Sequence, residues 1–415
     1  MENTHKNITN FFIYLLVITI SIFITLQEII LRNSDNKFFA YFDEATLLLA
    51  YAALPFAIRK RSELWILFIP ALPILSLIHA TIFSIALNLE ARTVAAAIQS
   101  LINFKFFLYF LLFNSLYIIL DRSGRVFTIA LYIVVGISGV GYALNIIYPH
   151  YFNFSDAVWH LERNRIVGFQ FKPNDLALLM SFFVAFLLFS ARQNFYRVFF
   201  ALVLVLLIAK TGSRTGLALS GIFLFSYLAL RKRYDWIALG LILSTLTAAF
   251  FYRELSASFF FSESVLNVSQ MFNIEDTKYV RALVIYYGFY IAALYFPLGA
   301  GAASYGTVMS AGSPVYALLG LDRNPFFEQQ IGIYDSGLAA VAGEYGAIGI
   351  TVFFVLTYKL FSYLFNRNKH LTYTFFFATF FLSVFQPFFS YQVNSLGLLL
   401  VAFSIRYALI DKTER

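Results

Sequence analysis

The stretch Lys210-Thr211-Gly212-Ser213-Arg214-Thr215-Gly216 lies between two apolar runs, residues 198–209 and 217–230. Apolar runs on both sides of a short, polar, glycine-containing stretch predict two membrane helices joined by a tight turn at the membrane edge. An arginine near hydrocarbon costs about 2.5–3.5 kcal/mol at a helix centre, and less near the interface, unless it meets water or an anion. Two interpretations stay open: an arginine that extends its charged end into water, or an anion site on the outer face.

The composition places the whole chain in the membrane class. Of the 415 residues, 60% are hydrophobic and 13% are charged, and the mean hydropathy is +0.75. These values exclude an ordinary soluble domain and predict an all-α polytopic integral membrane protein, with residues 1–415 forming a single membrane domain. The sequence contains about twelve segments apolar enough to suggest spanning helices. They are 9–31, 38–58, 63–88, 94–120, 125–148, 173–190, 196–209, 216–230, 235–252, 335–364, 372–388 and 394–410.

The placement of charges predicts the orientation of these helices. If the N-terminus is inside, the inner turns carry cation clusters such as Arg59-Lys60-Arg61 and Arg231-Lys232-Arg233, and most carboxylates fall outside. This pattern follows the positive-inside rule and predicts that both termini are cytoplasmic. The net charge of +8 does not indicate nucleic-acid binding, because the cations are spread over the loops and form no basic stripe.

Two exterior loops follow from this topology, residues 149–172 and 253–334. The second is longer than ordinary loops, so we expect it to be functional or partly folded. Within it, the apolar and aromatic segment Val280–Phe296 predicts a helix that lies in or dips into the outer leaflet. The large loop would then separate the ninth and tenth spanning helices.

The numbers and spacing of the cysteine and histidine residues do not favour metal or thiol chemistry. The chain has no cysteine, and its five histidines show no metal-ligand spacing. We therefore predict no metal site and no cofactor.

Lys105 stands out because it lies midway through the apolar segment 94–120. An intramembrane lysine marks a functional site unless a partner explains it. Candidate partners are the phosphate of a lipid substrate and Glu28, near the end of the first span. Glu344, in a glycine-rich part of the tenth span, is a third candidate partner and also a candidate site residue. Asp43-Glu44 is interpreted as a solvated helix start, which the helix dipole favours.

Four groups of residues resemble the superfamily of O-antigen polymerases and O-antigen ligases, which assemble bacterial surface polysaccharides. The four occur in the family's order between residues 163 and 350, and the other helices match only in number and character. They are Arg165 with Gly168 and Pro173-Asn174-Asp175-Leu176-Ala177; Thr211 to Gly216; Arg281 with Pro297-Leu298-Gly299-Ala300-Gly301; and Tyr334-Asp335-Ser336 with Glu344 to Gly349.

This resemblance implies a GT-C-like, metal-independent membrane glycosyltransferase at the outer face of the bacterial cytoplasmic (inner) membrane. Its substrates would be an undecaprenyl-pyrophosphate-linked glycan donor and acceptor held in membrane lipid, with a chain-length regulator and a flippase as further partners. Ligases of the family usually carry a histidine where this chain has Asp335, so the resemblance favours polymerase over ligase. A polysaccharide flippase or transporter remains the alternative from another class.

The chemistry of that reaction suggests roles for the candidate residues. Negative charge builds up on the leaving lipid diphosphate, and fixed arginines stabilise it because their planar fork binds two oxygens at once. We expect Arg214 and Arg281 to form this clamp and Asp335 to orient or deprotonate the acceptor hydroxyl. The candidates for substrate binding are Arg165, Lys210, Ser213, Asn174, Glu344 and Lys105.

Overall fold

The computed structural model describes most of the chain. The described residues are 2–33, 42–58, 60–89, 92–120, 124–148, 165–170, 172–190, 195–250, 266–267, 269–270 and 279–411. Residues 149–164 and 171 of the first predicted exterior loop, and most of 251–278 in the second, lie outside these ranges.

Every regular element named within those ranges is helical. The longer helices are α1 (Glu2–Asn33), α2 (Phe42–Ala52), α3 (Phe68–Ala86), α4 (Thr93–Asn103), α5 (Lys105–Ile119), α6 (Arg125–Ile147), α8 (Pro173–Phe189), α9 (Phe195–Lys210), α10 (Arg214–Leu230), α11 (Tyr234–Phe250), α14 (Val280–Leu294), α17 (Gly337–Leu364), α18 (Lys369–Phe385) and α19 (Gln392–Asp411). Shorter elements are α15 (Pro314–Leu318), α16 (Pro325–Glu328) and the 3-10 turns η2 (Leu54–Phe56), η3 (Arg61–Leu67), η4 (Gly168–Gln170), η5 (Val308–Ser310) and η6 (Leu321–Arg323).

The lengths and surfaces of these helices are those of a membrane protein. Within the described ranges, five helices are long and apolar enough to cross a membrane, or six if α4 and α5 form one bent span. Helices α8, α10 and α14 are apolar but shorter. Large apolar side chains also face outward along single helices, as Ile74, Ile78 and Ile82 do on α3. Such exposure is unusual in a soluble monomer and suits contact with lipid, so the predicted all-α membrane class is confirmed at this level.

Two predicted spans are broken. The segment 94–120 is divided at Phe104, where α4 and α5 meet at a bend of 54°. Inside α17, Gly346 has non-helical angles, with φ of 60° and ψ of −153°. Both breaks depart from the straight helices that hydropathy predicts.

The second break is stabilised by a loop that follows α14. At the break, Ala300 N donates to Gly343 O at 2.9 Å and Gly301 N donates to Glu344 O at 2.8 Å. Backbone carbonyls freed by a helix break need new partners when they are buried. The segment Pro297–Gly301 supplies those partners and thereby fixes the position of the break.

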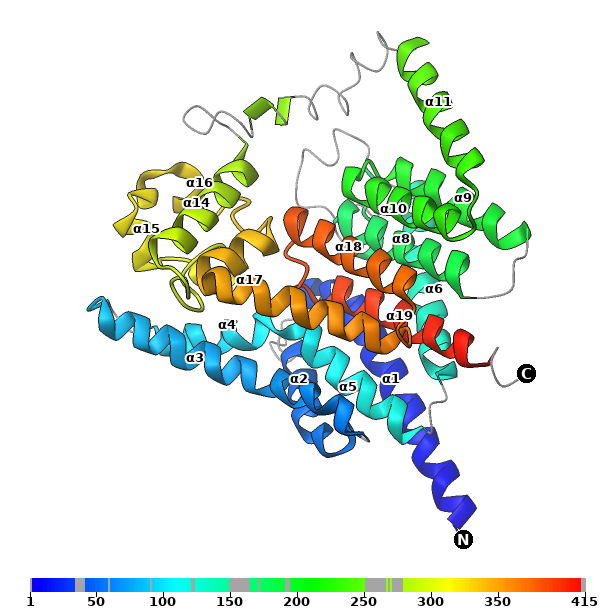
Figure 1. Cartoon of the computed structure of the whole chain (residues 1–415), viewed down its shortest axis with the longest axis horizontal. Coiled ribbons are helices and arrows are strands. Elements are labelled where there is room, and N and C mark those ends of the chain that lie inside the picture. Colours follow the sequence, from blue (N-terminus) through cyan, green and yellow to red (C-terminus); the bar gives the residue numbers. More distant parts are fainter. Residues whose placement is uncertain are drawn as a thin grey trace.

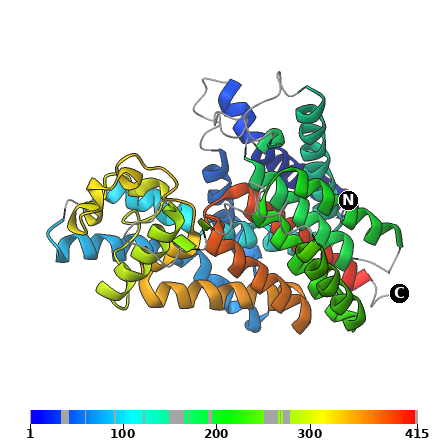
Figure 2. The same ribbon diagram turned by 90° about the horizontal axis from the view of Figure 1, so that it is seen from above.

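The buried apolar residues form two clusters. The larger joins α1, α5, α6, α8, α10, α18 and α19, and the smaller joins α14, the start of α17 and the segment 300–333. The helix predicted at 280–296 is therefore present, and the described part of the large loop is a folded unit with its own core. Figures 1 and 2 show this unit beside α3 and α4, on the opposite side of the molecule from α8, α9 and α10.

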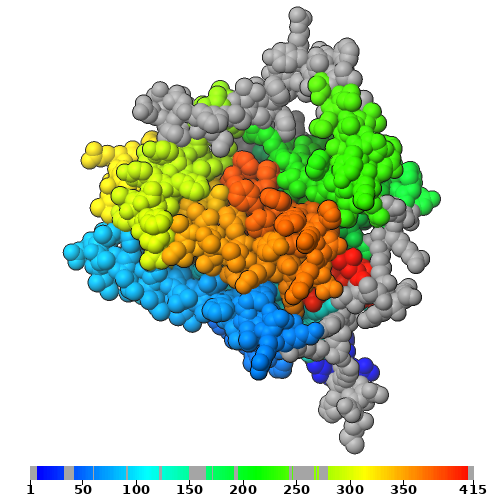
Figure 3. Space-filling view, in the orientation of Figure 1, coloured from blue at the N-terminus to red at the C-terminus, as the bar shows by residue number. Residues whose placement is uncertain are grey.

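Helices α17 and α18 lie between these two sides. In Figure 3 their orange surface is bordered by α3 in blue and by α14 in yellow-green. Helix α18 packs against both α17 and α10, and its last residue, Phe385, lies against Arg281.

Candidate functional site

The turn between α9 and α10 has the form that its sequence predicts. Helix α9 ends at Lys210, Gly212 adopts a φ of 68°, and Ser213 caps α10 by accepting a hydrogen bond from Gly216 N at 3.1 Å. A positive φ favours glycine, and a serine at the N-cap satisfies an amide that the first helical turn leaves open. Arg214 is consequently the first residue of α10, next to the amides of the helix start.

Three more candidates surround this turn. Arg165 donates from Nη2 to Gly212 O at 2.9 Å and from Nε to Thr211 O at 3.3 Å. Ser213 Oγ donates to Asn174 Oδ1, at the start of α8, at 2.8 Å. Arg165, Asn174, Ser213 and Arg214 are therefore brought together, and the two hydrogen bonds from Arg165 hold the turn in place. Lys210 lies beside them with an exposed side chain.

Arg281 and Asp335 form a second cluster at the starts of α14 and α17. Arg281 donates from Nη2 to Asp335 Oδ2 at 3.2 Å and from Nη1 to the Tyr279 hydroxyl at 3.0 Å. Its Nε is buried and has no hydrogen-bond partner among the described residues. The Arg281 side chain is 18% exposed and that of Asp335 is 48% exposed, so an approaching ligand meets Asp335 first.

The connection between α18 and α19, residues 386–391, links the two clusters. On one side, Gln386 O accepts from Gly337 N at 2.9 Å, at the start of α17. On the other side, Lys172 Nζ lies over the Tyr391 ring, 5.0 Å from its centroid. Lys172 is the residue before α8. The connection therefore contacts both the α17 start and the α8 start.

Arg214 and Arg281 thus lie at the same end of the helix bundle. Helices α8 and α10 begin together through Ser213 and Asn174, and α8 and α19 begin together because Asn394 donates to Asp175 at 3.2 Å. Helix α18 ends just before α19 begins, and there the guanidinium of Arg281 lies over the Phe385 ring, 5.9 Å from its centroid. The described residues 165–170 and 279–281, from the two predicted exterior loops, lie near this end.

Lys105 has a different environment from the one expected. Its side chain is 3% exposed and its Nζ bonds Asp43 Oδ2 at 2.5 Å and Glu44 Oε1 at 3.3 Å. The interpretation of Asp43 as a solvated helix start is therefore wrong, because that residue is buried and also accepts from Gln27 Nε2. The partner of Lys105 is neither Glu28 nor Glu344, and the pair ties α5 to α2.

We expect Lys105→Met to destabilise the protein by about 3–5 kcal/mol, because it leaves the Asp43 carboxylate buried without its cation. The measurement is the midpoint of thermal unfolding in detergent, followed by tryptophan fluorescence. The double variant Lys105→Met/Asp43→Asn removes both charges and should recover most of the loss. An unchanged midpoint in the single variant would contradict the pairing.

Glu344 lies where the two broken helices meet. It is fully buried and accepts hydrogen bonds from Asn103 Nδ2, at the end of α4, and from Thr307 Oγ1 at 2.7 Å. Asn103 and Ser76 of α3 both bond the hydroxyl of Tyr345. This buried polar network joins α3, α4 and α17 and lies apart from the Arg281 cluster in the described contacts.

Several residues of this region were not among the predicted site residues, although Asp175 belongs to one of the groups that resemble the superfamily. Asp175 and Asn394 are polar residues near the starts of apolar helices, and polar groups buried in such helices are a recognised signal for a paired site. Phe385 and the connection 386–391 carry no such signal, since they are uncharged and end an apolar helix. Only the folded chain shows that they lie between the two arginine clusters.

No protein-family model matches the chain, and a search of curated proteins finds no match. The fold and the candidate site define the protein as an all-helical membrane protein with arginines gathered at one end of its bundle.

Proposed function

We propose that this protein polymerises undecaprenyl-pyrophosphate-linked oligosaccharide repeat units, as an O-antigen polymerase does. The reaction would take place at the outer face of the bacterial cytoplasmic membrane, by metal-independent glycosyl transfer that releases lipid pyrophosphate. The proposal includes about twelve spanning segments, a GT-C-like architecture and cytoplasmic termini. Membrane lipid, a chain-length regulator and a flippase are its proposed partners.

The observation that carries this proposal is the position of Arg214 and Arg281 at one end of the bundle, linked through residues 386–391. Arg214 begins α10, so a bound anion would meet a guanidinium together with the free amides of a helix start. Arg281 lies in the first turn of α14, with a buried Nε that lacks a partner among the described residues. A departing diphosphate is an anion that suits both arginines.

Asp335 fits a second role in the same reaction. Its carboxylate is about half exposed and bonds Arg281 at 3.2 Å. A diphosphate that binds Arg281 would displace this carboxylate, which could then accept the proton of an attacking hydroxyl. In the absence of substrate, Asp335 holds the Arg281 guanidinium in place.

We expect Asp335→Asn to lower the turnover number about 100-fold or more, because general-base catalysis contributes on the order of 10²–10⁴ in rate. Donor binding should change only a few-fold, since the asparagine oxygen still accepts from Arg281. The measurement compares kcat and KM for chain extension by the purified protein. Asp322→Asn, an exposed acid of the same segment, is the matched control and should extend chains normally. Unchanged extension by the Asp335 variant would remove this residue from the mechanism.

The direct test of the function incubates the purified protein with lipid-linked repeat units and separates the products on a gel. A ladder with a spacing of one repeat, together with released lipid diphosphate, is expected. An O-antigen ligase would extend nothing and would instead move a preformed polymer to a lipid A-core acceptor. Either that result or an unchanged substrate would overturn the proposal.

One observation favours a transporter as the second candidate. Helices α4–α5 and α17 are both broken, and they meet at the buried Glu344. Discontinuous helices that meet at a buried polar group are typical of secondary transporters. Vesicles that contain the protein would then move a lipid-linked glycan across the membrane without extending it.

A further inference from the structure

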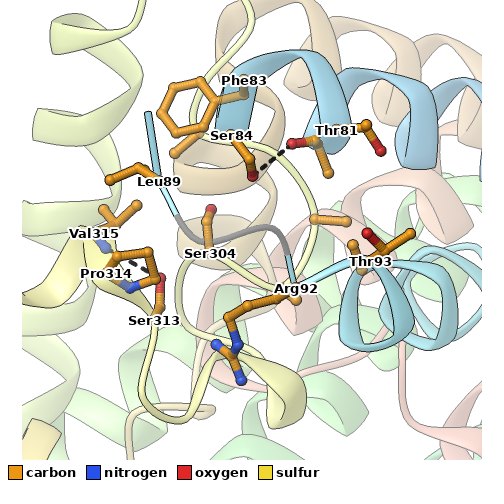
Figure 4. A pocket seen from close by; sticks show the side chains of 15 residues that line it. Thr81, Phe83, Ser84, Leu89, Arg92, Thr93, Ser304, Ser313, Pro314 and Val315 are labelled. Carbon is orange, nitrogen blue, oxygen red and sulfur yellow. Dashed lines mark hydrogen bonds between the residues drawn. The ribbon is translucent and has the colours of Figure 1, made fainter. Parts of the chain in front are cut away.

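A hollow near the end of α3 is too small for a ligand. It encloses about 30 Å³, which is room for a water molecule. Figure 4 shows Phe83 and Ser304 among the side chains that line it. A binding site of useful size therefore has to be sought elsewhere in the molecule.

A much larger cleft lies at the far end of α17. It has a volume of about 980 Å³ and is partly open to the surface. Its walls come from four residues between 60 and 65 in and before η3, from residues 358–368 at the end of α17 and in the turn that follows, and from Arg406 and Leu409 of α19. In Figure 1 this end of α17 lies beside α19. Pockets that bind small molecules typically have volumes of about 300–1,000 Å³.

The cleft lies at the opposite end of α17 from the Arg281 cluster. Asp335 and its partner Arg281 lie just before α17 begins, whereas the cleft starts at Tyr358, near the end of this 28-residue helix. A helix of that length extends roughly 42 Å, close to the thickness of a bilayer with its headgroups. The cleft would therefore lie at the level of lipid headgroups, on the membrane face that the cation pattern predicts to be cytoplasmic.

Cations outnumber acids among the residues that line this cleft. The described lining contains Lys60, Lys359, Arg367 and Arg406, and one acid, Glu63. Glu63 Oε2 accepts a hydrogen bond from the Lys60 amide at 3.2 Å, so this carboxylate is already engaged at the start of η3. Several like charges around one cleft repel one another unless an anion lies between them. The lining therefore favours an anionic occupant.

Arg406 is held in an orientation that suits an anion. Its guanidinium carbon lies 4.4 Å from the centroid of the Tyr363 ring and 4.8 Å from that of the Tyr117 ring. Two rings this close orient the planar group and leave its N–H donors to bond at the edge. Its Nη1 is buried and makes no hydrogen bond with a described residue. Buried donors in folded proteins nearly always have an acceptor, which an anion in the cleft would supply.

The surface beside the cleft matches the acyl chains of a lipid. Val355 precedes Lys359 by one turn of α17 and is 46% exposed, and Leu64 of η3 is 50% exposed. Residues four apart lie on the same face of a helix, so an exposed apolar side chain leads up to the lysine. Trp65 and Tyr358 line the cleft itself, and such amphipathic rings are typical of the headgroup level. A soluble anion would use the cations but not this apolar surface.

We propose that this cleft binds the phosphate headgroup of an anionic phospholipid, whose acyl chains lie along the exposed apolar face of α17. Basic pockets between membrane helices on the cytoplasmic side are typical sites for anionic headgroups. The bound lipid would bridge cations that come from three parts of the chain, at the starts of η3 and α18 and near the end of α19. This site goes beyond the proposed function and needs neither arginine cluster.

The test measures, by native mass spectrometry, how much phosphatidylglycerol the full-length protein retains in detergent, with phosphatidylcholine for comparison. The wild type should retain phosphatidylglycerol in preference. Lys359→Gln and Arg367→Gln should each weaken this binding about fivefold, and together about 25-fold, because one basic residue near an anionic lipid surface contributes roughly that factor. Both side chains are exposed, so these variants should fold normally.

The matched control is Lys232→Gln, which removes an exposed cation predicted at the same membrane face but outside the cleft lining. This variant should bind phosphatidylglycerol as the wild type does. An equal loss in Lys232→Gln would show that the charge of the whole face holds the lipid, and would overturn the cleft site. Equal retention of phosphatidylcholine would overturn the requirement for an anion.

A further arm separates a lipid from a soluble anion. Inorganic phosphate at the concentration of the lipid should not displace phosphatidylglycerol, and full displacement would overturn the assignment to a lipid. Arg214→Ala and Arg281→Gln should both keep phosphatidylglycerol bound, since neither residue lines the cleft. A failed polymerase assay would consequently leave the lipid site standing, and loss of lipid binding in Lys359→Gln would leave the polymerase proposal untouched.

Discussion

Arg214→Lys is expected to lower the rate of chain extension about 100–1,000-fold, almost as much as Arg214→Ala. Removing one fixed donor from a site of developing charge typically costs about this factor. Lysine keeps the positive charge but loses the planar fork that binds two phosphate oxygens at once. The position at the first residue of α10 adds to the effect, because a shorter and differently shaped cation would no longer lie beside the helix amides.

The measurement is the ladder of extended products formed by purified protein from lipid-linked repeats. Arg231→Lys is the matched control, since Arg231 follows the other end of the same helix and lies over the Tyr227 ring. That variant should extend chains at the wild-type rate. All variants should elute as monodisperse protein, because the Arg214 side chain is partly exposed. A normal ladder from Arg214→Lys would refute the two-oxygen contact.

Gly346→Ala is expected to destabilise the protein strongly, by about 2–6 kcal/mol. The residue has a φ of 60° and a ψ of −153°, which an alanine adopts only at a cost of about 1–3 kcal/mol. Its Cβ would also lie 2.5 Å from Pro297 O and 2.6 Å from Gly299 N. Both are backbone atoms that cannot rotate away, so the segment 297–301 would have to move, which adds an overpacking cost of about 1–3 kcal/mol.

The yield of monodisperse protein and its melting midpoint in detergent would report this loss. Gly136→Ala in α6 and Gly221→Ala in α10 are matched controls, because a Cβ at either position meets nothing within 4 Å. Each control should be neutral or slightly stabilising, as alanine is favoured over glycine inside a helix by about 0.5–1 kcal/mol. If Gly346→Ala behaved like these controls, α17 would be a continuous helix and the break would be absent.

The sequence predicted local features of the fold well. Apolar runs marked most helices, and the polar stretch 210–216 marked the turn between α9 and α10. That turn depends on local features, the positive φ of Gly212 and the serine cap of α10, which act through their own residues and neighbours. The helix at 280–296 within the large loop was also predicted correctly.

Features that depend on distant parts of the chain were not predictable in this way. The break at Gly346 is stable only because Ala300 and Gly301 take up the carbonyls it frees. The partner of Lys105 is Asp43, which is 62 residues away and was expected to face water. Hydropathy shows whether a segment is apolar but not which other segment it packs against. These pairings can therefore be identified only in the folded structure.

The candidate site was predictable in part. Arg165, Asn174, Ser213 and Arg214 could be grouped in advance because two of them lie in one turn and all four belong to patterns that resemble one family. The bond between Arg281 and Asp335 could not be predicted, since the two residues lie 54 positions apart in the sequence.

The connection 386–391 contains only uncharged residues, yet it contacts the starts of α17 and α8. These two helices pack against α14 and α10, which carry Arg281 and Arg214. Inserting or deleting a residue there would change the distance between Arg214 and Arg281 without substituting either residue. Such a change would adapt the protein to bulkier or slimmer anions without altering the groups that bind them.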